Sequence, residues 1–333
     1  YSHHQKINKS GTEIKRNYGC RICHCQFETI ERIIDSDECM EETMARSKCN
    51  FQLSLILIML VLGLIKTHPV SAASSIPVDL DTGYTYTYYD VTGDGRKDNF
   101  TVKAVSLDTY DTGDGYYNAV YLCVNGKGQY IKLKNMQMPF YSLKARLYIF
   151  DNARPLLYLS AKSDNDHKLI NGILRYENGR WKYLLDMTKA FGDYKQYARG
   201  EVIDNSGNNL KVRYEVMCWT IGFCRLDYTY IYKNGVLKPA SSYGKIIDYR
   251  TRYNGDRTII ANKSIRAYKK CGGGGTSFVL RKGNKATVQK WRYTGGRLYI
   301  RLKYGSKTGW INGQKQKNFV SSEQQWFSNL PYV

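Results

Sequence analysis

Residues 120 to 127 read VYLCVNGK, an apolar and aromatic run that stops at an Asn-Gly pair. The run favours a strand, and Asn-Gly favours the two-residue turn whose twist matches that of paired strands. The stretch therefore predicts a β-hairpin that turns at residues 125 and 126. The same pattern returns as ILRYENGRW at 173–181 and as YIYKNGVL at 230–237, and the Asn-Gly pairs of these three stretches begin at residues 125, 178 and 234.

The rest of residues 80–242 alternates in the same way, in runs such as GYTYTYYDV, RLYIF, LLYLSA, NLKVRYEV and LDYTYIY. This alternation is typical of strands. A repeat of about 50 residues with four strands has the size of a propeller blade, but three repeats are too few to close a usual propeller. We predict a mainly β fold, with antiparallel β-meander repeats over 80–242 that form an open stack, a sandwich or a small propeller. A short helix is the alternative for LLDMTKAFGDY, residues 184–194.

Residues 51–65, FQLSLILIMLVLGLI, form an apolar run that is shorter than the roughly 20 residues of a membrane span. Arg46 and Lys48 precede the run, and the small residues of VSAA follow it at 70–73. This order is typical of a secretory signal, so we predict a signal peptide over 44–72 that begins at Met44. A membrane anchor is the alternative. Residues 1–43 are then expected to be an upstream or untranslated extension.

The chain has 50 Lys and Arg against 29 Asp and Glu. Nine of the basic and eight of the acidic residues precede Ala73, which leaves 41 basic and 21 acidic residues and a net charge of +20. Such a surface attracts polyanions. For a protein that is secreted or associated with the cell wall, without a transmembrane segment in its mature part, the expected partners are anionic wall polymers or lipids. Nucleic acid is not expected.

Four cysteines follow residue 73, and two of them, Cys218 and Cys224, flank the stretch WTIGF. A hairpin at this stretch would make them face each other, so they are the candidate disulfide. Four free buried thiols are the alternative.

A second pattern begins near Thr258 and predicts five short strands with tight glycine turns, as in a small closed barrel. Three stretches, Ala267-Tyr268, LRKGNKATV at 280–288 and RLYIRLKYGSKTGWI at 297–311, resemble the bacterial SH3-like domains of secreted clostridial-type wall proteins. The resemblance covers 258–312, and the tail WFSNLPYV is similar to a packing segment that follows such domains. We therefore expect the module to span 258–333.

This resemblance implies binding of cell-wall peptides or polysaccharides. Aromatic faces stack on sugars or peptide groups, and Lys and Arg between them meet phosphate or carboxylate. The candidate contact residues are Trp291, Tyr293, Tyr299, Tyr304 and Trp310. The alternative is that the tryptophans and alternate tyrosines belong to the core.

The stretch YYDVTGDGRKDNF, residues 88–100, resembles the calcium loop of FG-GAP-type β-propeller repeats. Calcium takes six to eight oxygen ligands, and glycine at the sixth loop position permits the bend. The expected ligands are Asp90, Thr92, Asp94, the carbonyl of Arg96, and Asp98. Thr101 stands where an EF-hand has a bidentate Glu, so we expect a strand–loop–strand staple.

A polar loop without metal is the alternative for residues 88–100. A second acidic stretch, with Asp108, Asp111 and Asp114, is expected to be a solvated turn, with a weak metal site as the alternative.

Catalytic motifs are missing after residue 73: there is no G-x-S-x-G elbow and no H-E-x-x-H helix. The glutamates there fix no catalytic pair; they are Glu177, Glu201, Glu215 and Glu323. We therefore expect a secreted, non-catalytic protein that binds peptidoglycan or anionic wall polymer through the SH3-like domain. A wall hydrolase with carboxylates in the repeat region and a purely structural surface protein are the alternatives.

Overall fold

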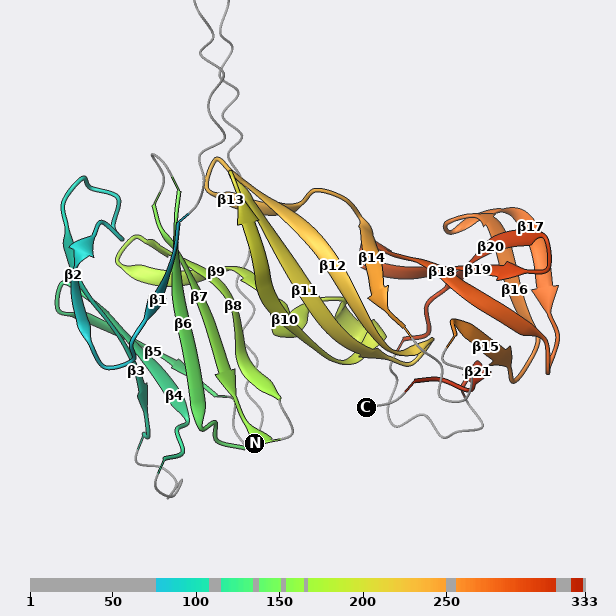
Figure 1. Ribbon diagram of the computed structural model, residues 1–333, viewed down its shortest axis with the longest axis horizontal. Helices are drawn as coiled ribbons and strands as arrows, with labels where there is room; N and C mark the ends of the chain where they lie inside the picture. The colour runs from blue at the N-terminus through green and yellow to red at the C-terminus, as the bar shows by residue number, and fades with distance from the viewer. Residues whose placement is uncertain are drawn as a thin grey trace, which may run out of the picture. The chain divides into compact units, whose positions relative to one another are not determined.

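Figure 1 shows the computed structural model of the chain, which divides into two units, residues 1–68 and 69–333. The structure describes residues 76–107, 115–133, 138–150, 154–164, 167–249, 256–315 and 325–331, all in the second unit. The predictions for the extension, the signal peptide, the acidic stretch at 108–114 and Glu323 lie outside these residues. Within the described ranges, no helix has the length and apolarity to cross a membrane.

The described chain is mainly β, and its strands pair antiparallel, as predicted. The first sheet has the order β1-β6-β7-β8-β9, with strands Ile76–Leu80, Ser142–Ile149, Leu156–Lys162, Lys168–Glu177 and Arg180–Asp186. The second sheet has the order β2-β3-β4-β5, with strands Thr85–Tyr89, Asp98–Val105, Ala119–Val124 and Lys127–Lys132.

The third sheet has twelve strands. Its first five are β10 Lys195–Ser206, β11 Asn209–Cys218, β12 Gly222–Lys233, β13 Val236–Pro239 and β14 Tyr243–Asp248. The others are β15 Thr258–Ala261, β16 Ile265–Lys270, β17 Gly273–Leu280, β18 Lys285–Thr294, β19 Arg297–Tyr304, β20 Lys307–Asn312 and β21 Phe327–Ser328. Residues 184–194, for which a short helix was the alternative, contain two single-turn 3-10 helices, η2 Met187–Lys189 and η3 Gly192–Tyr194.

Three of the chain's six Asn-Gly pairs, those at residues 125, 178 and 234, form the predicted hairpin turns. They connect β4 to β5, β8 to β9 and β12 to β13. Asn125, Asn178 and Asn234 have φ of 49°, 52° and 51°, and the glycines after them have φ of 77°, 79° and 73°. Two successive left-handed residues define the turn that suits twisted antiparallel strands, and Asn-Gly adopts them at low cost.

The first sheet is a central layer between two cores. Leu157 and Leu159 on β7 belong to one core, which the second sheet covers with residues such as Phe100 and Leu122. The alternate β7 residues Leu156 and Tyr158 belong to the other core, together with residues of the third sheet. Six successive β7 residues are therefore buried, as in strands that are covered on both faces.

Strand β14 joins the C-terminal module to the strands before it. It pairs with β12 on one side and with β18 on the other. The sequence suggested a connection at residues 243–257, but 243–248 continue the sheet from β12 into the C-terminal strands (Figure 1). No sheet in the described residues closes into a barrel, so an open twelve-stranded sheet replaces the expected small barrel.

Candidate functional site on the C-terminal module

The loop at residues 90–98 is held together by its own carboxylates. Asp90 accepts hydrogen bonds from the backbone N–H groups of Gly93 (2.5 Å), Asp94 (3.2 Å) and Gly95 (2.8 Å). Gly95 has φ +84°, a left-handed conformation at the bend, as the motif predicts. The backbone thus turns as expected for a calcium loop.

Asp98 lies under this loop and is only 2% exposed. Its carboxylate accepts hydrogen bonds from the N–H groups of Val91 (2.8 Å) and Thr92 (2.9 Å) and from Nδ2 of Asn125 (2.6 Å). The bond from Asn125 ties the loop to the β4–β5 turn. A buried carboxylate requires such donors, because an unpaired one would lose the hydration of its charge.

The fit of this loop to calcium is incomplete. Within the described residues, no three carboxylate, imidazole or thiol groups come together as a metal site. Asp90 and Asp98 are engaged by N–H groups, and Asp94 accepts one bond from the N–H of Arg96 (2.8 Å). Hydrogen bonds alone account for the shape of the loop, so calcium at these residues stays a prediction.

Three of the five predicted contact residues pack against aromatic rings of the hydrophobic core. Trp291 is completely buried, and its ring centroid lies 5.2 Å from that of Phe191. Tyr293 packs on the same Phe191 ring at 5.6 Å, and Tyr304 packs on Phe278 at 5.6 Å. Trp291 therefore lies in the core, which was the alternative to ligand contact that the sequence allowed, and its ring is not accessible to a ligand.

The other two predicted residues lie on the outer face of the third sheet. Tyr299 stands opposite Arg292 on β18, and Trp310 stands opposite Arg301 on β19. Their alternate neighbours Ile300 and Ile311 point into the core. Neighbouring side chains cover both rings, which leaves Tyr299 8% and Trp310 9% exposed.

An exposed tyrosine completes this face. Tyr243 on β14 is 44% exposed and stands opposite Arg292. The Arg292 guanidinium lies 5.0 Å from the centroid of the Tyr243 ring, and that ring lies 6.1 Å from Trp310. The face therefore presents aromatic and cationic groups side by side, and its accessible ring, Tyr243, belongs to a strand that precedes residues 258–312.

A hollow lies beside this face, with a volume of about 250 Å³. Trp326, Tyr268 and Ile265 supply its apolar wall, and its polar lining consists of Lys263, Ser264, Arg266 and Asn312. The Lys263 ammonium is 5.6 Å from the centroid of the Trp326 ring. An aromatic wall with cations and an amide at its rim suits a sugar ring or a short acidic peptide.

Trp326 is a site residue that the sequence did not predict, because the tail was assigned to packing. Phe327 and Leu330 are indeed buried core residues. Trp326 is half-buried: it packs against the edge of the same core and also lines the hollow, and its carbonyl accepts a hydrogen bond from the N–H of Asn262 (2.9 Å). The sequence could not show that one part of this ring stays accessible while the rest packs on the core.

The candidate disulfide requires a correction. The predicted hairpin is present, but Cys218 stands opposite Gly222 and Cys224 opposite Val216, so the two cysteines are diagonal neighbours. Diagonal pairs lie about 7–8 Å apart, farther than a disulfide usually spans. Both are buried free thiols, and burial raises the pKa of Cys218 to about 11.

Comparison of the chain with models of known families, with curated proteins and with solved structures finds no match. The functional argument therefore depends on the geometry.

Proposed function

We propose that this protein is a non-catalytic binding protein of the bacterial cell surface, which attaches to wall material through its C-terminal module. One observation carries the proposal. The hollow brings Trp326 and Tyr268 together with Lys263 and Arg266 on an accessible surface. Rings stack on glycan faces, and cations pair with the carboxylates of wall peptides.

Three features of the sequence support the same assignment. Residues 258–312 resemble SH3-like domains of wall proteins, and residues 44–72 have the pattern of a secretory signal. The net charge of +20 after residue 72 strengthens attraction to an anionic wall. Calcium bound in the loop at 90–98 would add stability outside the cell without taking part in ligand binding.

The ionisation of two glutamates that line one groove, Glu201 and Glu215, favours binding over hydrolysis as the function. Burial opposes the ionisation of both carboxyls and would raise their pKa values. Lys144 and Lys168 outweigh this effect at Glu201, so its pKa is lowered. Arg225 and Arg199 do the same at Glu215. A glycosidase needs one carboxyl with a raised pKa to protonate the leaving group. A cleared zone on wall material that disappears in Glu215→Gln would overturn the binding assignment.

Binding to purified sacculi tests the proposal. We expect Trp326→Leu to weaken binding by about tenfold, because one lost aromatic stack is worth roughly 1–3 kcal/mol. Tyr88→Leu is the matched control, since Tyr88 is 62% exposed and lies on β2, away from the hollow.

Sacculi stripped of anionic polymer separate stacking from charge. The proposal requires that the stripped sacculi still bind the wild-type protein better than Trp326→Leu. Equal binding of the two proteins would contradict it.

A further inference from the structure

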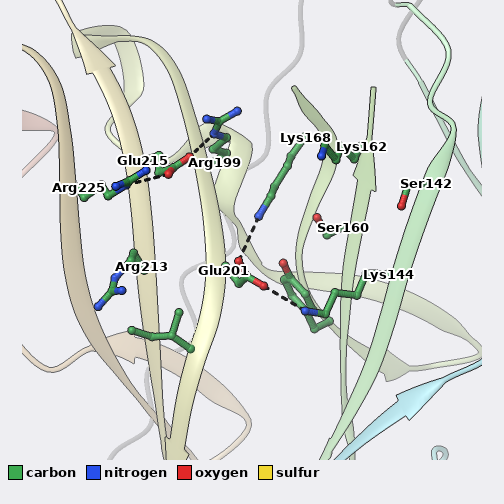
Figure 2. Close-up of a pocket in the computed structure, with 12 residues that line it drawn as sticks. Ser142, Lys144, Ser160, Lys162, Lys168, Arg199, Glu201, Arg213, Glu215 and Arg225 are labelled. Carbon is green, nitrogen blue, oxygen red and sulfur yellow. Dashed lines mark hydrogen bonds and ion pairs between the residues drawn. The ribbon is translucent and has the colours of Figure 1, made fainter. Parts of the chain in front are cut away.

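A second candidate site lies between the first and the third sheet, far in sequence from the hollow. It is a groove of about 560 Å³. Figure 2 shows side chains of β6, β7 and β8 on one wall and side chains of β10, β11 and β12 on the other. The lining residues are Ser142, Lys144, Tyr158, Ser160, Lys162, Lys168, Arg199, Glu201, Ile203, Arg213, Glu215 and Arg225.

The register of the third sheet creates one wall. Arg199, Glu215 and Arg225 stand opposite one another on β10, β11 and β12. Nε of Arg199 lies 2.5 Å and Nε of Arg225 lies 2.9 Å from the two oxygens of the Glu215 carboxylate. In the next row, Arg213 pairs with Asp227 at 2.9 Å. Arginines therefore alternate with carboxylates across this wall.

Glu201 connects the two walls. Its carboxylate pairs with Nζ of Lys144 at 3.1 Å and lies 4.0 Å from Nζ of Lys168, both on the opposite wall (Figure 2). Lys168 also donates a hydrogen bond to the carbonyl of Gly200 (3.2 Å). Burial lowers the pKa of Lys168, although the charge of Glu201 acts in the other direction.

A buried asparagine sets the separation of the walls. Asn171 on β8 is completely buried, donates from Nδ2 to the carbonyl of Gly200 (3.0 Å) and accepts the N–H of Gly200 at Oδ1 (2.7 Å). These two bonds connect β8 to β10 at the residue between Arg199 and Glu201. The arrangement of the charged side chains is therefore part of the folded core.

Positive charge is in excess in the groove. Six lining residues are Lys or Arg and two are Glu. Asp227 and Asp248 lie outside the lining and pair with Arg213 and Arg225. Each lining glutamate is shared by two cations, so an anionic ligand would compete with glutamates for cations that are already positioned.

We propose that this groove binds a linear phosphate polymer, such as a polyol phosphate of the cell wall. Phosphate oxygens accept the Lys and Arg donors that both walls present. Among the described residues that line the groove, Tyr158 is the only aromatic one and is 2% exposed, so the described lining offers no ring to stack on sugars or bases. Recognition through charge alone favours a chain without rings over polyuronates or single-stranded nucleic acid, whose proteins usually stack on their rings.

Two substitutions at one ion pair give opposite expected results. Lys144→Gln removes a cation, and we expect it to weaken binding of inorganic polyphosphate to the full chain by about threefold. Glu201→Gln removes the competing carboxylate, and we expect it to strengthen the same binding by about threefold. Both side chains are 46% exposed, and a folding defect would not produce opposite shifts.

Lys103→Gln is the matched control, because Lys103 is an exposed lysine on β3 outside the groove. Its substitution removes the same charge from the whole protein and should leave polyphosphate binding nearly unchanged. Affinity should fall as salt is raised, since salt screens the cations. Equal loss in Lys103→Gln and Lys144→Gln, or unchanged affinity in Glu201→Gln, would overturn the site.

Comparison of ligands tests the chemical class. Tighter binding of polygalacturonate or of single-stranded poly-dT than of polyphosphate would overturn the phosphate assignment. Trp326→Leu should retain polyphosphate binding in full, and Lys144→Gln should retain binding to sacculi stripped of anionic polymer. These variants thus test the proposal for the groove and the proposal for the hollow independently of each other.

Discussion

Asp98, Asp90 and Asp94 show how three carboxylates in one loop take different roles. Asp98 is buried under the loop and accepts hydrogen bonds from Val91, Thr92 and Asn125, and Asp90 accepts the N–H groups of the turn. Asp94 is exposed and accepts one N–H, from Arg96. Asp90 and Asp98 therefore shape the loop with or without an ion, and Asp94 is the residue at which calcium should make the largest difference.

We expect Asp94→Ala to lower the melting temperature more in millimolar calcium than in chelator. Calcium that binds only the folded loop adds about 2–3 kcal/mol when its concentration is about a hundred times the Kd, and the variant would lose most of this gain. We expect a small loss of melting temperature in chelator as well, because the variant lacks the hydrogen bond from the N–H of Arg96 to Asp94. Thermal unfolding of both proteins in both buffers measures the effect, and an equal loss in the two buffers would show that no calcium acts through Asp94.

At the scale of elements, strands β10, β11 and β12 separate apolar and charged faces by simple alternation. Val212, Tyr214 and Val216 on β11 point into the core. Arg213 and Glu215 between them point outward and meet charged partners on both neighbouring strands. Cross-strand ion pairs add modest stability, about 0.2–1 kcal/mol each, so the alternating charges mainly fix the register and the wall of the groove.

Glu215→Gln should reduce the free energy of unfolding at pH 7 by about 1 kcal/mol, because Arg199 and Arg225 would lose their shared carboxylate. The folded-state pKa of Glu215 is lowered from its ordinary value of 4.5. Its contribution is therefore fully present above pH 4.5 and is lost as the pH falls through the folded-state pKa.

Denaturant unfolding of wild type and Glu215→Gln across this range measures the pH effect. The difference between the two proteins should shrink below pH 4.5. Asp193→Asn serves as the control, because Asp193 is 73% exposed and its pair with Lys315 is 3.8 Å long. A difference that grows in acid would contradict the role given to Glu215.

At the scale of the whole molecule, the C-terminal strands share a core with the strands before them. Phe191 contacts Trp291 and Tyr293 from the C-terminal module and Tyr214 and Tyr228 from β11 and β12. Strand β14 pairs with both groups of strands. The core of the module is therefore continuous with the core of the strands before it.

We expect a fragment of residues 250–333 to fold poorly on its own, because it lacks Phe191 and β14 and would expose Trp291. Red-shifted tryptophan emission and a broad thermal transition would report this exposure. A fragment of residues 187–333 is the control, since it retains Phe191 and β10–β14 and should unfold more cooperatively. A sharp transition with a buried tryptophan in the short fragment would contradict the shared core.

The sequence by itself determined the hairpins, the mainly β class and the turn of the acidic loop. These features depend on local preferences: Asn-Gly adopts left-handed turns, alternating aromatic residues pair in strands, and Asp90 reaches the N–H groups only a few residues ahead of it. Local patterns of this kind are visible in a window of about ten residues. They also showed that aromatic and basic residues share the C-terminal module.

Only the tertiary structure decided which of those residues are accessible and which strands meet. Trp291 and Trp310 have similar surroundings in the sequence, yet Trp291 points into the core and Trp310 outward. The pairing of β14 with β18, the position of Trp326 beside Tyr268 and the groove between the first and third sheets join residues far apart in the chain. Burial of the shared core selects such contacts, and that selection depends on all strands together.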